Sequence, residues 1–156
     1  MANGVAVGSS DRRRCRSAPH EFGQDVALHV DTLLVGAPRA DVASAETGAA
    51  YVFTRSGSTW TQQAKLAGSD AGPDSLVGFS LDLLGDVALL GTPLFDGPTP
   101  GSNHGAAFVQ VRSGVSWSPE ARLDAGQGAA TAYFGSSVAV AGDLAMVGAH
   151  SDDVGK

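Results

Sequence analysis

The sequence predicts an all-β fold made of β-propeller blades, which are four-stranded antiparallel repeats, arranged as an incomplete ring of about two and a half blades. Two observations predict this fold. One segment occurs three times, at residues 22–38, 77–93 and 134–150. Short β-rich runs, separated by turn residues, fill the sequence between the copies. No stretch of the chain requires a helix.

The repeats are in register. In every copy a glycine follows the opening residue by 14 positions, in the pairs Phe22–Gly36, Val77–Gly91 and Phe134–Gly148. The periods of the two whole units are 55 and 57 residues, and the difference falls in one loop, between the segment and the next strand. Loops absorb insertions because a strand would change register. We therefore predict repeats at 22–76 and 77–133, and a partial repeat at 134–156.

The first two strands of each unit form a tight hairpin. In the first unit they are predicted at residues 24–30 and 32–37, separated by Asp31. The later units have Gly-Asp at the same point, at residues 85–86 and 142–143, and this dipeptide type favours a two-residue hairpin turn.

A second strand pair follows a loop. In the first unit it comprises residues 48–55 and 59–66 around Gly57, and in the second it begins at Gly105 and ends with residues 116–123. The distance from the opening glycine of the pair to its tryptophan is 12 residues in both units. Four short strands per unit are typical of a propeller blade. The large aromatic residues are predicted to pack between adjacent blades.

Residues 1–21 do not align with the repeat. They contain four arginines, at positions 12, 13, 14 and 16, and we interpret them as a solvated, disordered arm. A twin-arginine export signal is excluded because no apolar segment follows the arginines. Cys15 is the only cysteine, so no intrachain disulfide can form and the redox compartment stays open.

The charge of the chain excludes one class of partner. The net charge is −6, and the positive arm leaves −8 on residues 22–156. Nucleic-acid binding needs clustered cations, so we expect no nucleic-acid partner. The most apolar window, residues 76–95, contains two aspartates and several glycines, so we expect no membrane insertion. No signal peptide is visible.

The repeated residues resemble the FG-GAP repeat family, known from the propeller of integrin alpha subunits and from bacterial secreted or surface proteins. The resemblance covers residues 22–156. It rests on Phe22-Gly23, Gly78 and Phe134-Gly135, each followed by a closing triplet, at residues 36–38, 91–93 and 148–150. The similarity implies an integrin-alpha-like propeller in an extracellular or cell-surface protein that binds a protein or glycan partner.

Two features depart from the family pattern. Its metal-binding members have an acidic calcium loop between the first two strands, whereas this chain has one carboxylate per turn there, at residues 31, 86 and 143. Calcium takes about six to eight oxygen ligands, so we expect no metal and no cofactor. The second departure is the number of blades, because such propellers close with about seven.

Three aspartates are the candidate binding residues. Asp41, Asp96 and Asp153 each lie three residues after a closing triplet, in the loop that the resemblance places on the partner-binding face. The alternative is a turn role, in which the carboxylate accepts nearby backbone N–H groups. The histidines occupy different repeat positions and predict no metal site. We identify no catalytic residue, since no nucleophile elbow is present.

Three hypotheses about function remain open. The first is a non-catalytic FG-GAP β-propeller segment for protein or glycan binding and adhesion, as a fragment of a larger secreted or surface protein. The alternative is part of a propeller-based hydrolase or lyase whose catalytic residues lie outside this chain. The third is an incomplete gene product without independent activity. Open blade faces would expose apolar surface, so we also expect self-association, with about three chains completing a ring.

Overall fold

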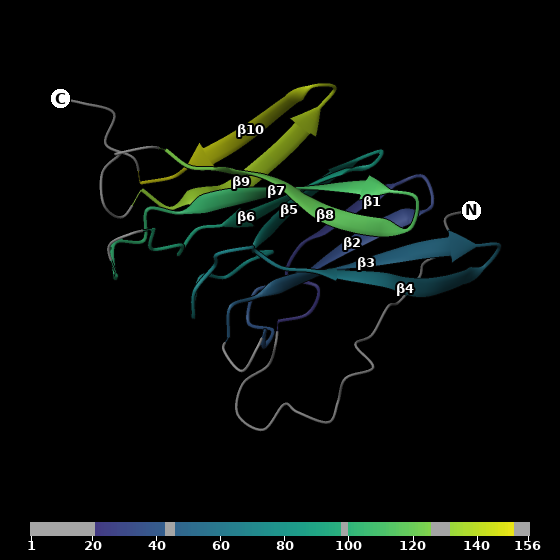
Figure 1. Ribbon diagram of the computed structural model, residues 1–156, viewed down its shortest axis with the longest axis horizontal. Helices are drawn as coiled ribbons and strands as arrows, with labels where there is room; N and C mark the ends of the chain where they lie inside the picture. Colours follow the sequence, from purple (N-terminus) through teal and green to yellow (C-terminus); the bar gives the residue numbers. More distant parts are fainter. Residues whose placement is uncertain (1–20, 43–45, 98–99, 126–131, 152–156) are drawn as a thin grey trace.

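The protein is all-β in its described part. The computed structural model describes residues 21–42, 46–97, 100–125 and 132–151. Within these ranges ten strands form three antiparallel sheets (Figure 1). These ranges contain no helix long and apolar enough to cross a membrane. The prediction of an all-β fold built from four-stranded blades is confirmed.

Each sheet is formed by consecutive strands, and we call the sheets blade 1, blade 2 and blade 3. Blade 1 has the order β1-β2-β3-β4, with β1 (Val26–His29), β2 (Thr32–Ala37), β3 (Ala49–Ser56) and β4 (Thr59–Leu66). Blade 2 has the order β5-β6-β7-β8, with β5 (Ser80–Leu84), β6 (Val87–Thr92), β7 (Ala106–Ser113) and β8 (Ser116–Leu123). Blade 3 is the hairpin of β9 (Phe134–Ala141) and β10 (Leu144–Ala149).

The first strand begins two residues later than the sequence predicts, at Val26 and not at Gln24. The backbone N–H of Gln24 donates to the carbonyl of Glu21 at 3.0 Å, which makes a turn. The Asp25 carboxylate then accepts the N–H of Val26 at 2.9 Å. The turn takes Gln24 out of the strand, so the regular register starts at Val26, although the Asp25 carbonyl still accepts the N–H of Gly36 at 2.9 Å.

The hairpins between the first two strands have two-residue turns, as predicted. Gly85 and Gly142 open the turns of blades 2 and 3 with φ of 59° and 60°. Blade 1 has Val30 at this position, with φ of 53°. A left-handed conformation costs an L-residue roughly 1–2 kcal/mol, so packing of the hairpin must offset strain at Val30.

The main hydrophobic core lies between blade 1 and blade 2. Side chains alternate between the two faces of a strand. We call the face toward the next blade the front face and the face toward the preceding blade the back face. The front face of blade 1 and the back face of blade 2 form one buried cluster, which includes Leu34, Val52, Leu66, Leu81, Leu90 and Phe108.

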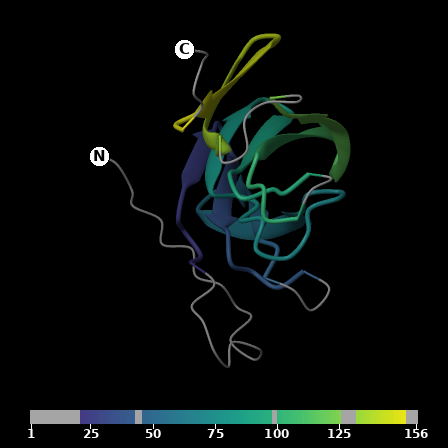
Figure 2. The ribbon, with the colours of Figure 1, turned by 90° about the vertical axis from the view of Figure 1, so that its left-hand side faces the viewer.

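The blades form an open stack. The strand β1 lies beside β5, and β5 lies beside β9, so the first strands of all blades follow one another along one side. Figure 2 shows the hairpin of blade 3, in yellow, projecting at the top beyond the other two sheets. The prediction of an incomplete ring is confirmed. The predicted arm lies outside the described residues, except for Glu21.

Candidate functional site

The connections of the blades lie at two opposite ends. The hairpin turns β1–β2, β3–β4, β5–β6, β7–β8 and β9–β10 lie at one end, on the right in Figure 1, which we call the turn end. Because neighbouring strands are antiparallel, the β2–β3 and β6–β7 loops and the connections between blades lie at the other end, which we call the loop end. All three sequence-predicted aspartates follow strands that end there.

Asp96 organises its own loop. One carboxylate oxygen accepts the N–H of Gly101 at 2.8 Å, and the other accepts the N–H of Asn103 at 3.2 Å. The Ser102 hydroxyl donates to the Asp96 carbonyl. These bonds hold the longer of the two loops in a compact form. The structure therefore gives Asp96 the turn role that the sequence analysis set against a binding role.

Asp41 differs from Asp96. It is exposed, and its carbonyl, not its carboxylate, accepts a hydrogen bond from Lys65 Nζ at 2.7 Å. Within the described ranges its carboxylate accepts no hydrogen bond, so it is open to solvent or to a partner. The structure does not bring Asp41 and Asp96 into contact, and Asp153 lies outside the described residues.

The turn end carries a repeated ion pair that the sequence analysis missed. Asp31 in the β1–β2 turn accepts Arg55 Nε at 2.8 Å, and Asp86 in the β5–β6 turn accepts Arg112 Nε at 2.7 Å. Each guanidinium also lies over the indole of its own blade, at 5.8 Å from Trp60 and 5.3 Å from Trp117. The signal was present, since a turn aspartate and a β3-type arginine recur in both whole units.

These ion pairs bear on metal binding at the turn end. The single carboxylate in each of the two turns is already paired with an arginine, which opposes a nearby cation. The described part of the chain also contains no group of three or more His, Cys, Asp or Glu side chains that could hold a metal ion. The absence of a calcium site stays a prediction.

The glycines of the repeated segment bring neighbouring blades into backbone contact. A Cβ added to Gly36 of blade 1 would overlap the carbonyl oxygen of Gly78, which opens blade 2. A Cβ added to Gly78 would lie 2.6 Å from the carbonyl oxygen of Ala49. The same overlap recurs between Gly91 and Gly135, one unit later. The closing glycine of one unit therefore packs directly on the opening glycine of the next.

Two aspartates, one just before β1 and one on β5, connect the blades further. The Asp25 carboxylate accepts the N–H of Val26 at 2.9 Å and that of Leu81, at the same position of blade 2, at 2.7 Å. The Asp82 carboxylate accepts the N–H of Leu83 at 2.8 Å and that of Val140, at the same position of blade 3, at 2.7 Å. Each carboxylate thus joins two equivalent N–H groups of adjacent blades.

The two tryptophans differ in their hydrogen bonding. Trp117 Nε1, in blade 2, donates to Gln63 Oε1 of blade 1 at 2.9 Å. Trp60 Nε1, at the same position of blade 1, is buried and has no hydrogen-bond partner among the described residues. Buried polar groups are normally paired. The back face of blade 1 is therefore one half of the interface that blade 2 makes completely.

The comparisons with known proteins agree with this geometry. A protein-family model described as the FG-GAP repeat matches residues 17–53, 60–110 and 117–156. No curated protein matches the chain. The matched residues include the four glycines at which neighbouring blades pack on each other, Gly36, Gly78, Gly91 and Gly135, and they cover most of the sequence. The chain therefore belongs to the FG-GAP repeat family and carries three β-propeller-type repeats.

Proposed function

We propose that this chain is a non-catalytic FG-GAP β-propeller segment that binds a protein or glycan partner in the extracellular space or at a cell surface, as part of a larger secreted or surface protein. The observation that carries the proposal is the loop end. There the loops of adjacent blades lie on one side of the stack, and Asp41 offers an exposed carboxylate without a hydrogen-bond partner in the described ranges.

The loops are suited to recognition and the strands to support. The β2–β3 and β6–β7 loops differ in length, although the strands on either side of them have equal lengths in the two blades. Variable loops on a rigid scaffold are a common arrangement of binding sites. The net charge of −6 favours a neutral or cationic partner over a polyanion, because like charges oppose association.

A binding screen tests the proposal. The 156-residue chain is applied to arrays of glycans and of extracellular protein domains, and we expect saturable binding to at least one neutral or cationic ligand. Loss of a hydrogen bond to a charged group costs about 1.5–3 kcal/mol, so Asp41→Ala should weaken binding roughly tenfold or more.

The matched control is Asp143→Ala, which removes an exposed carboxylate at the turn end. It should leave the affinity unchanged. The proposal is wrong if no ligand binds, or if both variants reduce the affinity equally.

A further inference from the structure

The back face of blade 1 exposes apolar side chains that its counterpart in blade 2 buries. Val26 and Leu28 on β1 are 59% and 64% exposed. Leu81 and Leu83 occupy the same positions on β5, and they are 6% and 5% exposed because blade 1 covers them. The exposed surface on β1 therefore has the chemistry of a blade interface without its second half.

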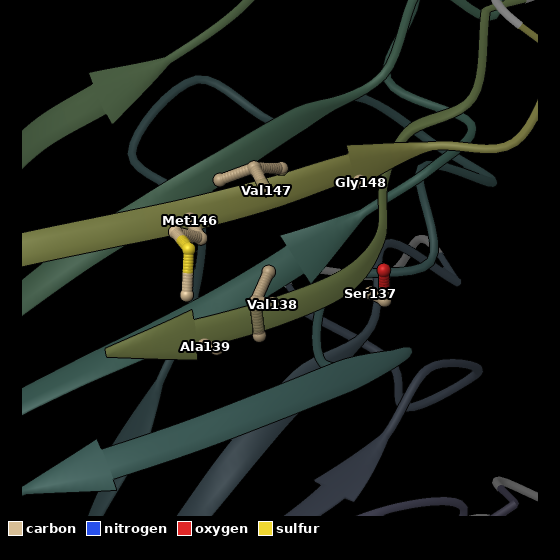
Figure 3. A pocket seen from close by; sticks show the side chains of 6 residues that line it. All are labelled: Ser137, Val138, Ala139, Met146, Val147 and Gly148. Atoms are coloured by element: carbon tan, nitrogen blue, oxygen red, sulfur yellow. The ribbon is translucent and has the colours of Figure 1, made fainter. Parts of the chain in front are cut away.

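The front face of blade 3 also exposes an apolar side chain that its counterparts in blades 1 and 2 bury. Met146 on β10 is 61% exposed, whereas Leu34 and Leu89, at the same position of blades 1 and 2, are 0% exposed. Ser137, Ala139, Met146 and Gly148 line a hollow on this hairpin (Figure 3). Ser80 has the repeat position of Ser137 in blade 2. Its hydroxyl donates to the Gly135 carbonyl of blade 3 at 2.9 Å.

The glycines at the two ends of the stack lack the contact with a neighbouring blade that the other repeat glycines make. Gly23, the opening glycine of blade 1, has no atom of the described residues within 4 Å of an added Cβ. For Gly148, the closing glycine of blade 3, the three atoms nearest to an added Cβ all belong to Ser137, on its own hairpin. Between blades 1 and 2, and again between blades 2 and 3, the equivalent glycines pack on each other. The two ends of the stack therefore continue one interface that the chain already makes twice.

We propose that the hairpin of blade 3 in one copy of this chain docks its front face against β1 of a second copy, head to tail. The widths of the two surfaces support a two-stranded hairpin as the partner of β1. Phe22 packs on Tyr51 and Phe53, with ring centroids at 5.5 and 6.3 Å, so the outer part of the back face of blade 1 is already covered. The exposed part is the inner strand, and a two-stranded hairpin is sufficient to cover it.

The contact joins two different surfaces, so each copy keeps one surface for another neighbour. Such a heterologous contact produces closed rings when the rotation closes and longer chains of copies when it does not. Met146 of one copy would be buried against β1 of the second copy, and Val26 of the second copy against the hairpin of the first. This burial of apolar surface supplies the hydrophobic contribution. The hydroxyl of Ser137 is positioned to donate to the Gly23 carbonyl of the second copy, as Ser80 donates to that of Gly135.

Analytical ultracentrifugation of the full 156-residue chain tests the proposal between about 1 and about 200 µM, the range of weak association. The average mass should rise with concentration. A lysine buried in an apolar contact is costly, so Met146→Lys and Val26→Lys should each lower the association constant roughly tenfold or more. Both positions are exposed in the single chain, so both variants should fold, which circular dichroism verifies.

A mixture of the two variants gives the sharpest result. Val26→Lys retains an intact hairpin and Met146→Lys an intact β1, so the mixture should form 1:1 dimers and nothing larger. The control Val115→Lys alters a 75% exposed residue of the β7–β8 turn and should associate as the unchanged chain does. The proposal is overturned if the unchanged chain stays monomeric, if the mixture forms no dimer, or if Val115→Lys also abolishes association.

Discussion

Replacing Gly78 with alanine is expected to lower the free energy of unfolding by about 2–5 kcal/mol, through left-handed backbone strain and overlap between blades. Gly78 has φ of 83°, and its added Cβ would lie 2.6 Å from the carbonyl oxygen of Ala49 in the preceding blade. That oxygen belongs to a strand and cannot rotate away, so blades 1 and 2 must separate. Urea unfolding followed by circular dichroism measures the loss.

Gly23→Ala is the matched control for this effect. Gly23 occupies the same repeat position with a similar φ of 92°, but in the part of the chain that the structure describes no atom lies within 4 Å of its added Cβ. The control substitution should therefore cost only the backbone term, roughly 1–2 kcal/mol. Equal losses in the two variants would contradict the direct packing of blade 2 on blade 1.

Replacing Leu34 with alanine is expected to cost about 2–5 kcal/mol, because it leaves a cavity in the core between blades 1 and 2. Leu34 is 0% exposed and packs in the cluster that both blades share. The same urea experiment gives the change in stability, and the slope of the transition reports whether unfolding stays cooperative.

Met146→Ala tests whether this cost comes from the covering blade. Met146 lies at the repeat position of Leu34, but it is 61% exposed because no blade among the described residues covers the front face of blade 3. In dilute protein its truncation should change the free energy of unfolding by less than about 0.5 kcal/mol. A loss as large as that of Leu34→Ala would show that the position is important within a single blade.

The strands and their order could be predicted from the sequence because the repeat supplies the same information more than once. The Gly-Asp dipeptides at 85–86 and 142–143 identified the hairpin turns and aligned the less typical turn at Val30 and Asp31 with them. The equal spacing from the opening glycine to the tryptophan fixed the second strand pair. The start of β1 was displaced because Gln24 lies in a turn, in which its N–H donates to the Glu21 carbonyl.

The hydrogen bonds between blades could not be predicted from the repeat. Asp25 and Asp82 each accept a backbone N–H of the next blade, but they stand at different repeat positions. Ser80 is at the position of Asp25 in the second unit, and Ala27 is at the position of Asp82 in the first. A comparison of the units therefore hides their common role. The turn role of Asp96 could be stated only as an alternative, since Asp41 has the same position and a free carboxylate in the described ranges.

The central claim is that consecutive units stack through one repeated interface, in which a carboxylate of one blade holds a backbone N–H of the next. Amide hydrogen exchange at Leu81 tests it most directly, because this N–H lies on the first strand of blade 2 and donates to Asp25 of blade 1. The account predicts slow exchange at Leu81 in the unchanged chain and faster exchange at this amide in Asp25→Ala. Fast exchange at Leu81 in the unchanged chain, or the same slow exchange in the variant, would contradict it.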